Sequence, residues 1–142
     1  MPGAPIVRAA PLRRPLEKRH QRSSFGHFAL RGGASVEAHH GVSIVLEDGT
    51  FLTTVGNADG RTGVVAKDPS GQTLAENAAR PGVHGEGTAK DEVVVFGCEN
   101  GALVYDAGTF TKLTAPDQPY GRMGNAYVSE TSPLIIGDYK DD

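Results

Sequence analysis

The sequence predicts an all-β protein, and three observations support this prediction. The apolar runs are short and rich in Val, Ile, Leu and Thr, as in "GVSIVL" and "EVVVFG". Nineteen glycines and nine prolines among the 142 residues interrupt these runs, which is typical of strands joined by tight turns. Apolar residues do not recur at intervals of three and four, so leucine-rich and helical repeats fit badly. Because 38% of the residues are hydrophobic, the chain can build one domain with a modest core.

The first 24 residues differ in charge from the rest of the chain. They carry six Lys and Arg against one Glu, a net charge of +5, so the remainder carries −8 of the total of −3. We therefore predict a disordered basic leader over residues 1–24, followed by an acidic body. The acidic body argues against nucleic acid as a partner, because binders of nucleic acid need positive charge to neutralise phosphates. No apolar signal-peptide core is visible, and no segment approaches the roughly 20 apolar residues of a membrane span, so we expect no membrane insertion.

Three stretches of the body align with one another. Each begins with an imidazole or aromatic residue followed by glycine, and ends with an apolar run, a glycine and a polar or sulfur-containing residue. Their first residues are 44 and then 36 positions apart, which brackets the roughly 40–45 residues of a four-stranded propeller blade. The sequence therefore predicts a partial β-propeller of four-stranded antiparallel blades, and the alternative is a small β-sandwich. The stretches are "HGVSIVLEDGTFLTTVGN", "HGEGTAKDEVVVFGC" and "YGRMGNAYVSETSPLIIGD".

The elements can be placed in order along this repeat. A closed propeller has about four to eight blades, so the chain is expected to be a fragment of about two and a half blades from a longer protein. The expected parts are outer strands of a preceding blade at 25–38, one blade at 39–79, a second blade at 80–115, and the start of a further blade at 116–142.

Tight turns should connect the strands within each blade. Asp48-Gly49 suits a type I′ hairpin turn, in which both central residues have a positive φ. The stretch "DPSG" suits the turn of the next hairpin. In the second blade we expect turns near Lys90-Asp91, Asn100-Gly101 and Ala107-Gly108.

The repeat assigns a position to the only cysteine, Cys98. Residues of an antiparallel hairpin that face each other have numbers with a constant sum, so a turn centred near Asp91 sets His84 opposite Cys98. The first strand of each blade lines the central channel of a propeller, so His40 and His84 would meet there, with Cys98 beside them. The same arithmetic pairs His40 with Asn57 and Tyr120 with Asp138.

Two imidazoles and a thiolate are ligands that suit Zn²⁺ and argue against Ca²⁺ or Mg²⁺. The predicted metal ligands are therefore His40, His84 and Cys98, and Asp138, Glu86, His39 or a water is available as the fourth ligand. Glu86 follows His84 by two residues, so on a regular strand it lies on the same face and could ligate the metal or orient an imidazole. The alternative is that Cys98 is a core thiol.

Several of these stretches together resemble the periplasmic zinc metallochaperones of the AztD type, which are β-propeller proteins. The stretches are "EAHHGVSIVLEDG", "GVHGEGTA", "VVVFGCENGALVY" and "IIGDYK". The likeness implies that the metal-binding centre of that family falls on His40, His84 and Cys98, with Asp138 as the fourth ligand. It implies a zinc-binding metallochaperone segment that delivers Zn(II) to the solute-binding protein of an ABC zinc importer, and a periplasmic parent protein. The chain departs from the family in lacking an export signal, most of the blades and an upstream segment rich in His and Asp.

Two other functions compete with this one. The first is a metal-independent interaction propeller with no intrinsic chemistry. The second is an enzyme with Cys98 as nucleophile, His84 as base and Glu86 as orienting group. We do not favour the enzyme, because neither a helix N-terminus that would stabilise a thiolate nor oxyanion donors can be identified. Open blades expose strand edges, so we expect the isolated chain to self-associate.

Overall fold

The computed structural model describes residues 6–8, 41–78, 81–116 and 121–140, and the structural statements below concern these residues. They contain eleven strands and one short 3₁₀ helix, and no helix among them is long and apolar enough to cross a membrane. The elements are β1 (Ile6–Arg8), β2 (Ser43–Val45), β3 (Phe51–Gly56), β4 (Arg61–Lys67), β5 (Thr73–Asn77), β6 (His84–Thr88), η1 (Lys90–Glu92), β7 (Val94–Cys98), β8 (Asn100–Asp106), β9 (Thr109–Thr114), β10 (Gly121–Ser129) and β11 (Ser132–Lys140).

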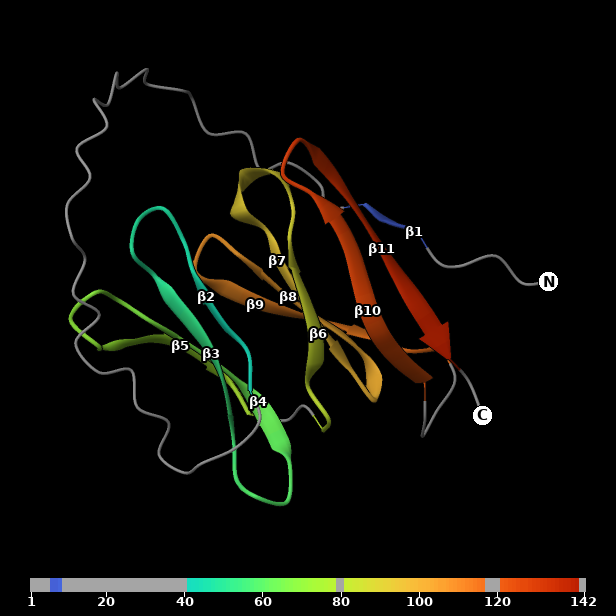
Figure 1. Ribbon diagram of the computed structural model, residues 1–142, viewed down its shortest axis with the longest axis horizontal. Helices are drawn as coiled ribbons and strands as arrows, with labels where there is room; N and C mark the ends of the chain where they lie inside the picture. The colour runs from blue at the N-terminus through green and yellow to red at the C-terminus, as the bar shows by residue number, and fades with distance from the viewer. Residues whose placement is uncertain (1–5, 9–40, 79–80, 117–120, 141–142) are drawn as a thin grey trace.

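Two antiparallel meanders of four strands follow one another in the chain (Figure 1). The first meander, β2-β3-β4-β5, is a separate sheet and lies within the predicted blade 39–79. The second, β6-β7-β8-β9, lies within the predicted blade 80–115. The hairpin β10–β11 begins a third unit, and β10 joins the second sheet through a short parallel pairing with β8. The predicted all-β fold, a partial β-propeller of four-stranded antiparallel blades, is confirmed. We call the three units the first, second and third blade.

Part of the basic leader belongs to the third blade. The three residues of β1 pair antiparallel with β11, in the register Ile6 to Ile136 and Arg8 to Leu134. These three residues of the predicted leader form the edge strand next to β11 in the seven-stranded sheet. The remainder of the leader and the outer strands expected at 25–38 lie outside the described residues.

The turn between β2 and β3 has one residue more than expected. The N–H of Gly49 donates to the carbonyl of Leu46 at 2.9 Å, and the N–H of Leu46 donates to the carbonyl of Thr50 at 2.9 Å. Gly49 has a φ of +85°, whereas Asp48 is not among the residues with positive φ. The prediction of a type I′ turn at Asp48-Gly49 is therefore wrong. The hairpin has a three-residue loop that ends in a glycine of left-handed conformation.

Two further turn predictions, at Ala107-Gly108 and in the stretch that starts at Asp68, are confirmed. Ala107 and Gly108, with φ of +45° and +86°, join β8 to β9 in the conformation of a type I′ turn. The stretch "DPSG" joins β4 to β5, and the Asp68 carboxylate accepts hydrogen bonds from the Ser70 hydroxyl at 2.6 Å and from the N–H of Gln72 at 2.9 Å. These hydrogen bonds, that of the Ser70 hydroxyl first, hold the pKa of Asp68 below its usual value.

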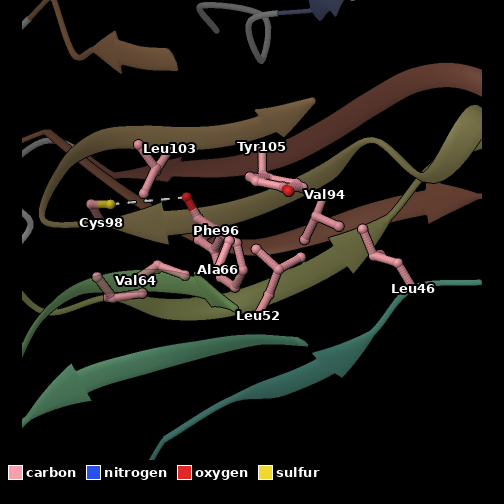
Figure 2. Close-up of a cluster of buried hydrophobic side chains, with 10 residues drawn as sticks. Leu46, Leu52, Val64, Ala66, Val94, Phe96, Cys98, Leu103 and Tyr105 are labelled. Carbon is pink, nitrogen blue, oxygen red and sulfur yellow. Dashed lines mark hydrogen bonds between the residues drawn. The ribbon is translucent and has the colours of Figure 1, made fainter. Parts of the chain in front are cut away.

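The first and second blades pack face to face through an apolar core (Figure 2). Alternate residues of β7 point into this core, and they meet side chains from β3 and β4 of the first blade. Burial also raises the pKa of Tyr105 above its usual value, with a smaller contribution from the nearby Asp48 carboxylate. The buried residues of this core are Leu46, Leu52, Val64, Ala66, Val83, Val94, Phe96, Cys98, Leu103 and Tyr105.

A second core lies between the second and third blades. Val95, on the opposite face of β7 from Phe96, packs there with residues of β8, β10 and β11. All five residues of β7 are consequently buried, because this strand lies between the two cores. The buried residues of the second core are Ala89, Val93, Val95, Ala102, Met123 and Ile135.

The backbone of β10 crosses the β6–β7 hairpin at a distance that only glycine permits. A Cβ built on Gly97 would lie 2.6 Å from the carbonyl oxygen of His84 and 2.7 Å from that of Gly124, and it would also overlap the carbonyl oxygen of Met123. A Cβ on Gly85 would overlap the carbonyl oxygen of Gly124 in the same way. The second and third blades are therefore held at a separation set by backbone against backbone.

We predict that Gly97→Ala lowers the free energy of unfolding by about 3 kcal/mol, because the added methyl group forces β10 away from β7. Gly60→Ala is the matched control, since a Cβ at Gly60 would meet nothing within 4 Å. It should leave stability unchanged or raise it by about 0.4–1 kcal/mol. Urea unfolding of both variants measures the difference, and equal stabilities would show that β10 does not press on Gly97.

Candidate metal-binding residues

The hairpin of β6 and β7 carries three of the predicted metal ligands. Near its turn the register is the one expected, with Thr88 opposite Val94 and Glu86 opposite Phe96. At Gly85, which has a φ of +65°, a β-bulge inserts one residue, and His84 then pairs with Gly97. The prediction that His84 stands opposite Cys98 is therefore wrong by one residue.

This bulge also changes the face on which the imidazole lies. Successive residues of a strand point to opposite faces, and Phe96 and Gly97, the partners of Glu86 and His84, are successive on β7. His84 and Glu86 therefore lie on opposite faces of the sheet, and the expectation of a shared face is wrong. Both side chains are exposed, and His84 is on the side that β10 covers.

The Cys98 thiol lies in the core between the first and second blades. The residue is 0% exposed, and its Sγ is 3.9 Å from the carbonyl oxygen of Phe96 (Figure 2). Its neighbours on that face of β7 are Phe96 and Val94, and Leu103 of β8 lies beside it. The position of Cys98 is that of a buried thiol in an apolar core.

The turn after Cys98 connects the segment that enters the second blade with the segment that enters the third blade. The N–H of Glu99 donates to the carbonyl of Pro81 at 3.1 Å, and the carbonyl of Glu99 accepts from the N–H of Gly121 at 3.1 Å. The Glu99 carboxylate also lies 4.0 Å from Arg122 of β10. The segments that enter the second and the third blade are thus both bonded to one residue. The "CENG" stretch has a structural role that the search for metal ligands missed.

Asp138 accepts hydrogen bonds from a second bulge, which lies in the hairpin of β10 and β11. Gly124 and Asn125 lie opposite Asp138, between the pairs Met123 with Tyr139 and Ala126 with Gly137. One carboxylate oxygen of Asp138 accepts from the N–H of Asn125 at 2.5 Å, and the other accepts from its side-chain amide at 3.0 Å. Asn125 is thus a partner that the sequence analysis missed, although a Gly-Asn pair inside a strand is a signal of a bulge.

The described residues do not assemble the predicted ligand set. Among them, no three His, Cys, Asp or Glu side chains are grouped so that they could hold a metal ion. His40, His39 and Tyr120 lie outside the described residues, so the pairings of His40 with Asn57 and of Tyr120 with Asp138 are not described. The assignment of His40, His84, Cys98, Asp138 and Glu86 as metal ligands stays a prediction.

Comparison with solved structures finds the same architecture in AztD. The crystal structure of AztD from Citrobacter koseri matches with a TM-score of 0.55 and 22% sequence identity, over 71% of this chain and 29% of that chain. The structure of apo AztD from the same organism matches with a TM-score of 0.56 and 22% identity, over 71% of this chain and 30% of that chain. The chain thus spans less than a third of the length of these proteins. No protein-family model and no curated protein matches the sequence. The resemblance to AztD is confirmed at the level of the fold.

We predict that the Cys98 thiol reacts with iodoacetamide only when the blades separate, because the thiol is fully buried. The modification rate should rise with urea in parallel with the loss of β-sheet circular dichroism. Rapid modification of the folded chain in buffer would contradict the buried position.

We predict that Asp138→Ala lowers the free energy of unfolding by about 1–2 kcal/mol, because it removes the acceptor of two hydrogen bonds that hold the bulge. Asp59→Ala, which removes an exposed carboxylate from the turn between β3 and β4, is the control and should have little effect. Thermal unfolding of the two variants tests this, and equal midpoints would assign no structural role to Asp138.

Proposed function

We propose that this chain is a zinc-binding segment of a periplasmic metallochaperone that delivers Zn(II) to the solute-binding protein of an ABC zinc importer. The observation that supports it best is the exposed imidazole of His84 at the start of β6, in a fold shared with AztD. The proposed role is non-enzymatic, since it requires binding and release of a metal ion and no bond making in a substrate.

The repeat in the sequence predicts a second imidazole near His84. His84 is the first residue of β6, the first strand of its blade, and His40 precedes β2, the first strand of the preceding blade, by three residues. Because first strands of neighbouring blades line a common channel, we propose His40 and His84 as the primary ligands. Imidazole nitrogen is a preferred zinc ligand, and water or a carboxylate can occupy the remaining positions.

The other predicted ligands differ in what binding would require of them. Asp138 already accepts two hydrogen bonds, but a carboxylate has further lone pairs that a metal can use. Glu86 is exposed on the opposite face from His84, so it would act only after a change in the bulge at Gly85. Cys98 would ligate only if the first two blades parted, because its thiol is in their shared core.

A site with few protein ligands suits a protein that passes its metal on. Structural zinc sites are closed by four protein ligands, whereas a site with an open position retains water and exchanges it. Two imidazoles with water would bind Zn(II) and leave room for a ligand of the receiving protein. This arrangement supports delivery better than permanent storage.

The second candidate function is a metal-independent interaction propeller. It is favoured by the burial of Cys98 among apolar side chains. In that case His84 contacts only solvent or a protein partner.

We predict that the chain retains one Zn(II) in native mass spectrometry after addition of one equivalent, and that His84→Ala and His40→Ala each lose it. His20→Ala is the matched control, because it removes an imidazole from the basic leader and should keep the metal. Cys98→Ala should also keep the metal, since the thiol is remote from solvent. A chelator in excess should remove the zinc from the parent chain while circular dichroism stays unchanged.

Three results would count against parts of this proposal. A folded chain that retains no zinc supports the interaction propeller. Zinc retained by all histidine variants assigns the ligands elsewhere. Loss of zinc in a folded Cys98→Ala variant makes the thiol a ligand and requires that the first two blades open on binding.

A further inference from the structure

Glu99 and His84 lie on the same side of the second blade. Val83 and Cys98 both belong to the core between the first and second blades. Successive residues of an extended chain point to opposite sides, so His84, directly after Val83, points toward the third blade. Glu99 points the same way, because it directly follows Cys98, and its carboxylate does lie beside Arg122 of the third blade. An imidazole and a carboxylate therefore share one face at the end of the blade where β6 begins.

The register of β6 on β7 sets how far apart these two residues are. His84 pairs with Gly97, and Glu99 is two residues after Gly97. Such diagonal neighbours on one face of an antiparallel pair are about 7–8 Å apart, a distance that long side chains can span. A glutamate and a histidine in these positions can therefore bind the same metal ion.

The Glu99 side chain is positioned by its own backbone and by a glycine. The N–H of Glu99 donates to the carbonyl of Pro81 at 3.1 Å, and its carbonyl accepts from the N–H of Gly121 at 3.1 Å. The side chain then lies over Gly82, where an added Cβ would be 2.6 Å from the Cδ and 2.7 Å from the Cγ of Glu99. Gly82 thus leaves room for the carboxylate two residues before His84.

Arg122 of β10 holds the same carboxylate only weakly. One guanidinium nitrogen of Arg122 is 4.0 Å from the Oε1 of Glu99, and the two side chains are 29% and 43% exposed. Water screens an ion pair of this length and exposure, so the pair contributes little to stability. The remaining lone pairs of the carboxylate are available to a metal ion.

We propose that Glu99 is a ligand of the zinc site that includes His84, and that Arg122 competes with the metal ion for the Glu99 carboxylate. This inference rests on the function proposed above. Carboxylate oxygen and imidazole nitrogen are both zinc ligands in proteins. The site takes its imidazole and its carboxylate from the second blade and its competing cation from the third.

Competition by Arg122 suits a site that releases its metal. A guanidinium and a divalent cation beside one carboxylate repel each other, so each weakens the binding of the other. When the metal ion leaves, Glu99 returns to Arg122 and does not remain an unpaired carboxylate. The ion pair thus favours transfer of zinc to a receiving protein.

Competition with a chromophoric zinc chelator, applied to the full chain and its variants, measures the dissociation constant of zinc. Glu99→Gln keeps the length of the side chain and removes its charge. It should raise the dissociation constant at least about tenfold, which corresponds to about 1.4 kcal/mol. Glu76→Gln, which removes an exposed carboxylate from β5 of the first blade, is the matched control and should leave the constant unchanged.

Arg122→Gln should lower the dissociation constant about two- to fivefold, in line with the strength of an exposed ion pair, and should slow the transfer of zinc to the chelator. Lys90→Gln, which removes an exposed positive charge at the turn of the β6–β7 hairpin, is the control and should change neither quantity. The double variant Glu99→Gln/Arg122→Gln should have the constant of Glu99→Gln, because Arg122 acts through the carboxylate.

Each contrary result has a distinct meaning, provided that circular dichroism shows each variant to be folded. A parent chain that binds no zinc overturns the proposed function and this inference together. Zinc that is bound by the parent, lost in His84→Ala and unchanged in Glu99→Gln overturns this inference alone. Weaker binding in Arg122→Gln overturns the competition, because Arg122 then positions the carboxylate. Equal tightening by Arg122→Gln with and without the carboxylate also overturns it, because the effect is then simple charge repulsion.

Discussion

The burial of β7 on both of its faces is the constraint on which the described structure depends. Val94, Phe96 and Cys98 pack on the first blade, and Val95 packs against the third. A fully buried apolar side chain of this size stabilises the fold by about 1.5–3 kcal/mol, so one short strand contributes to two interfaces at once. The turn that follows β7 adds backbone hydrogen bonds from Glu99 to the entry of the second and the third blade. The packing of the three blades against one another thus depends on one strand and the turn that follows it.

Close packing on both sides of β7 explains why bulges and glycines gather near the predicted metal ligands. Gly97 and Gly85 face the backbone of β10 where a side chain would not fit, and Gly85 is the bulged residue that rotates His84 away from the face of Cys98. The bulge opposite Asp138 lies in the segment of β10 that makes this approach. Residues that would face each other in a regular hairpin are therefore separated by the bulges that tight packing requires.

The same packing separates two roles within the "HGEGTAKDEVVVFGC" stretch. The histidine at its start is exposed and is available to a ligand, whereas the cysteine at its end is part of a core. A propeller can place function at the first strand of each blade while the second strand holds neighbouring blades together.

The sequence by itself determined the strand content, the period of the repeat and most of the turns. Alternating apolar residues and turn-forming pairs such as Ala107-Gly108 are local signals, and they were sufficient to place β6 to β9. The tertiary structure alone decided the register at His84, the three-residue loop that ends at Gly49, the pairing of β1 with β11 and the burial of Cys98. These features depend on how closely β10 approaches β7 and on which face of each blade is covered. Such distances between segments far apart in the chain leave no local pattern in the sequence, because a single inserted residue reverses the face of every side chain that follows it.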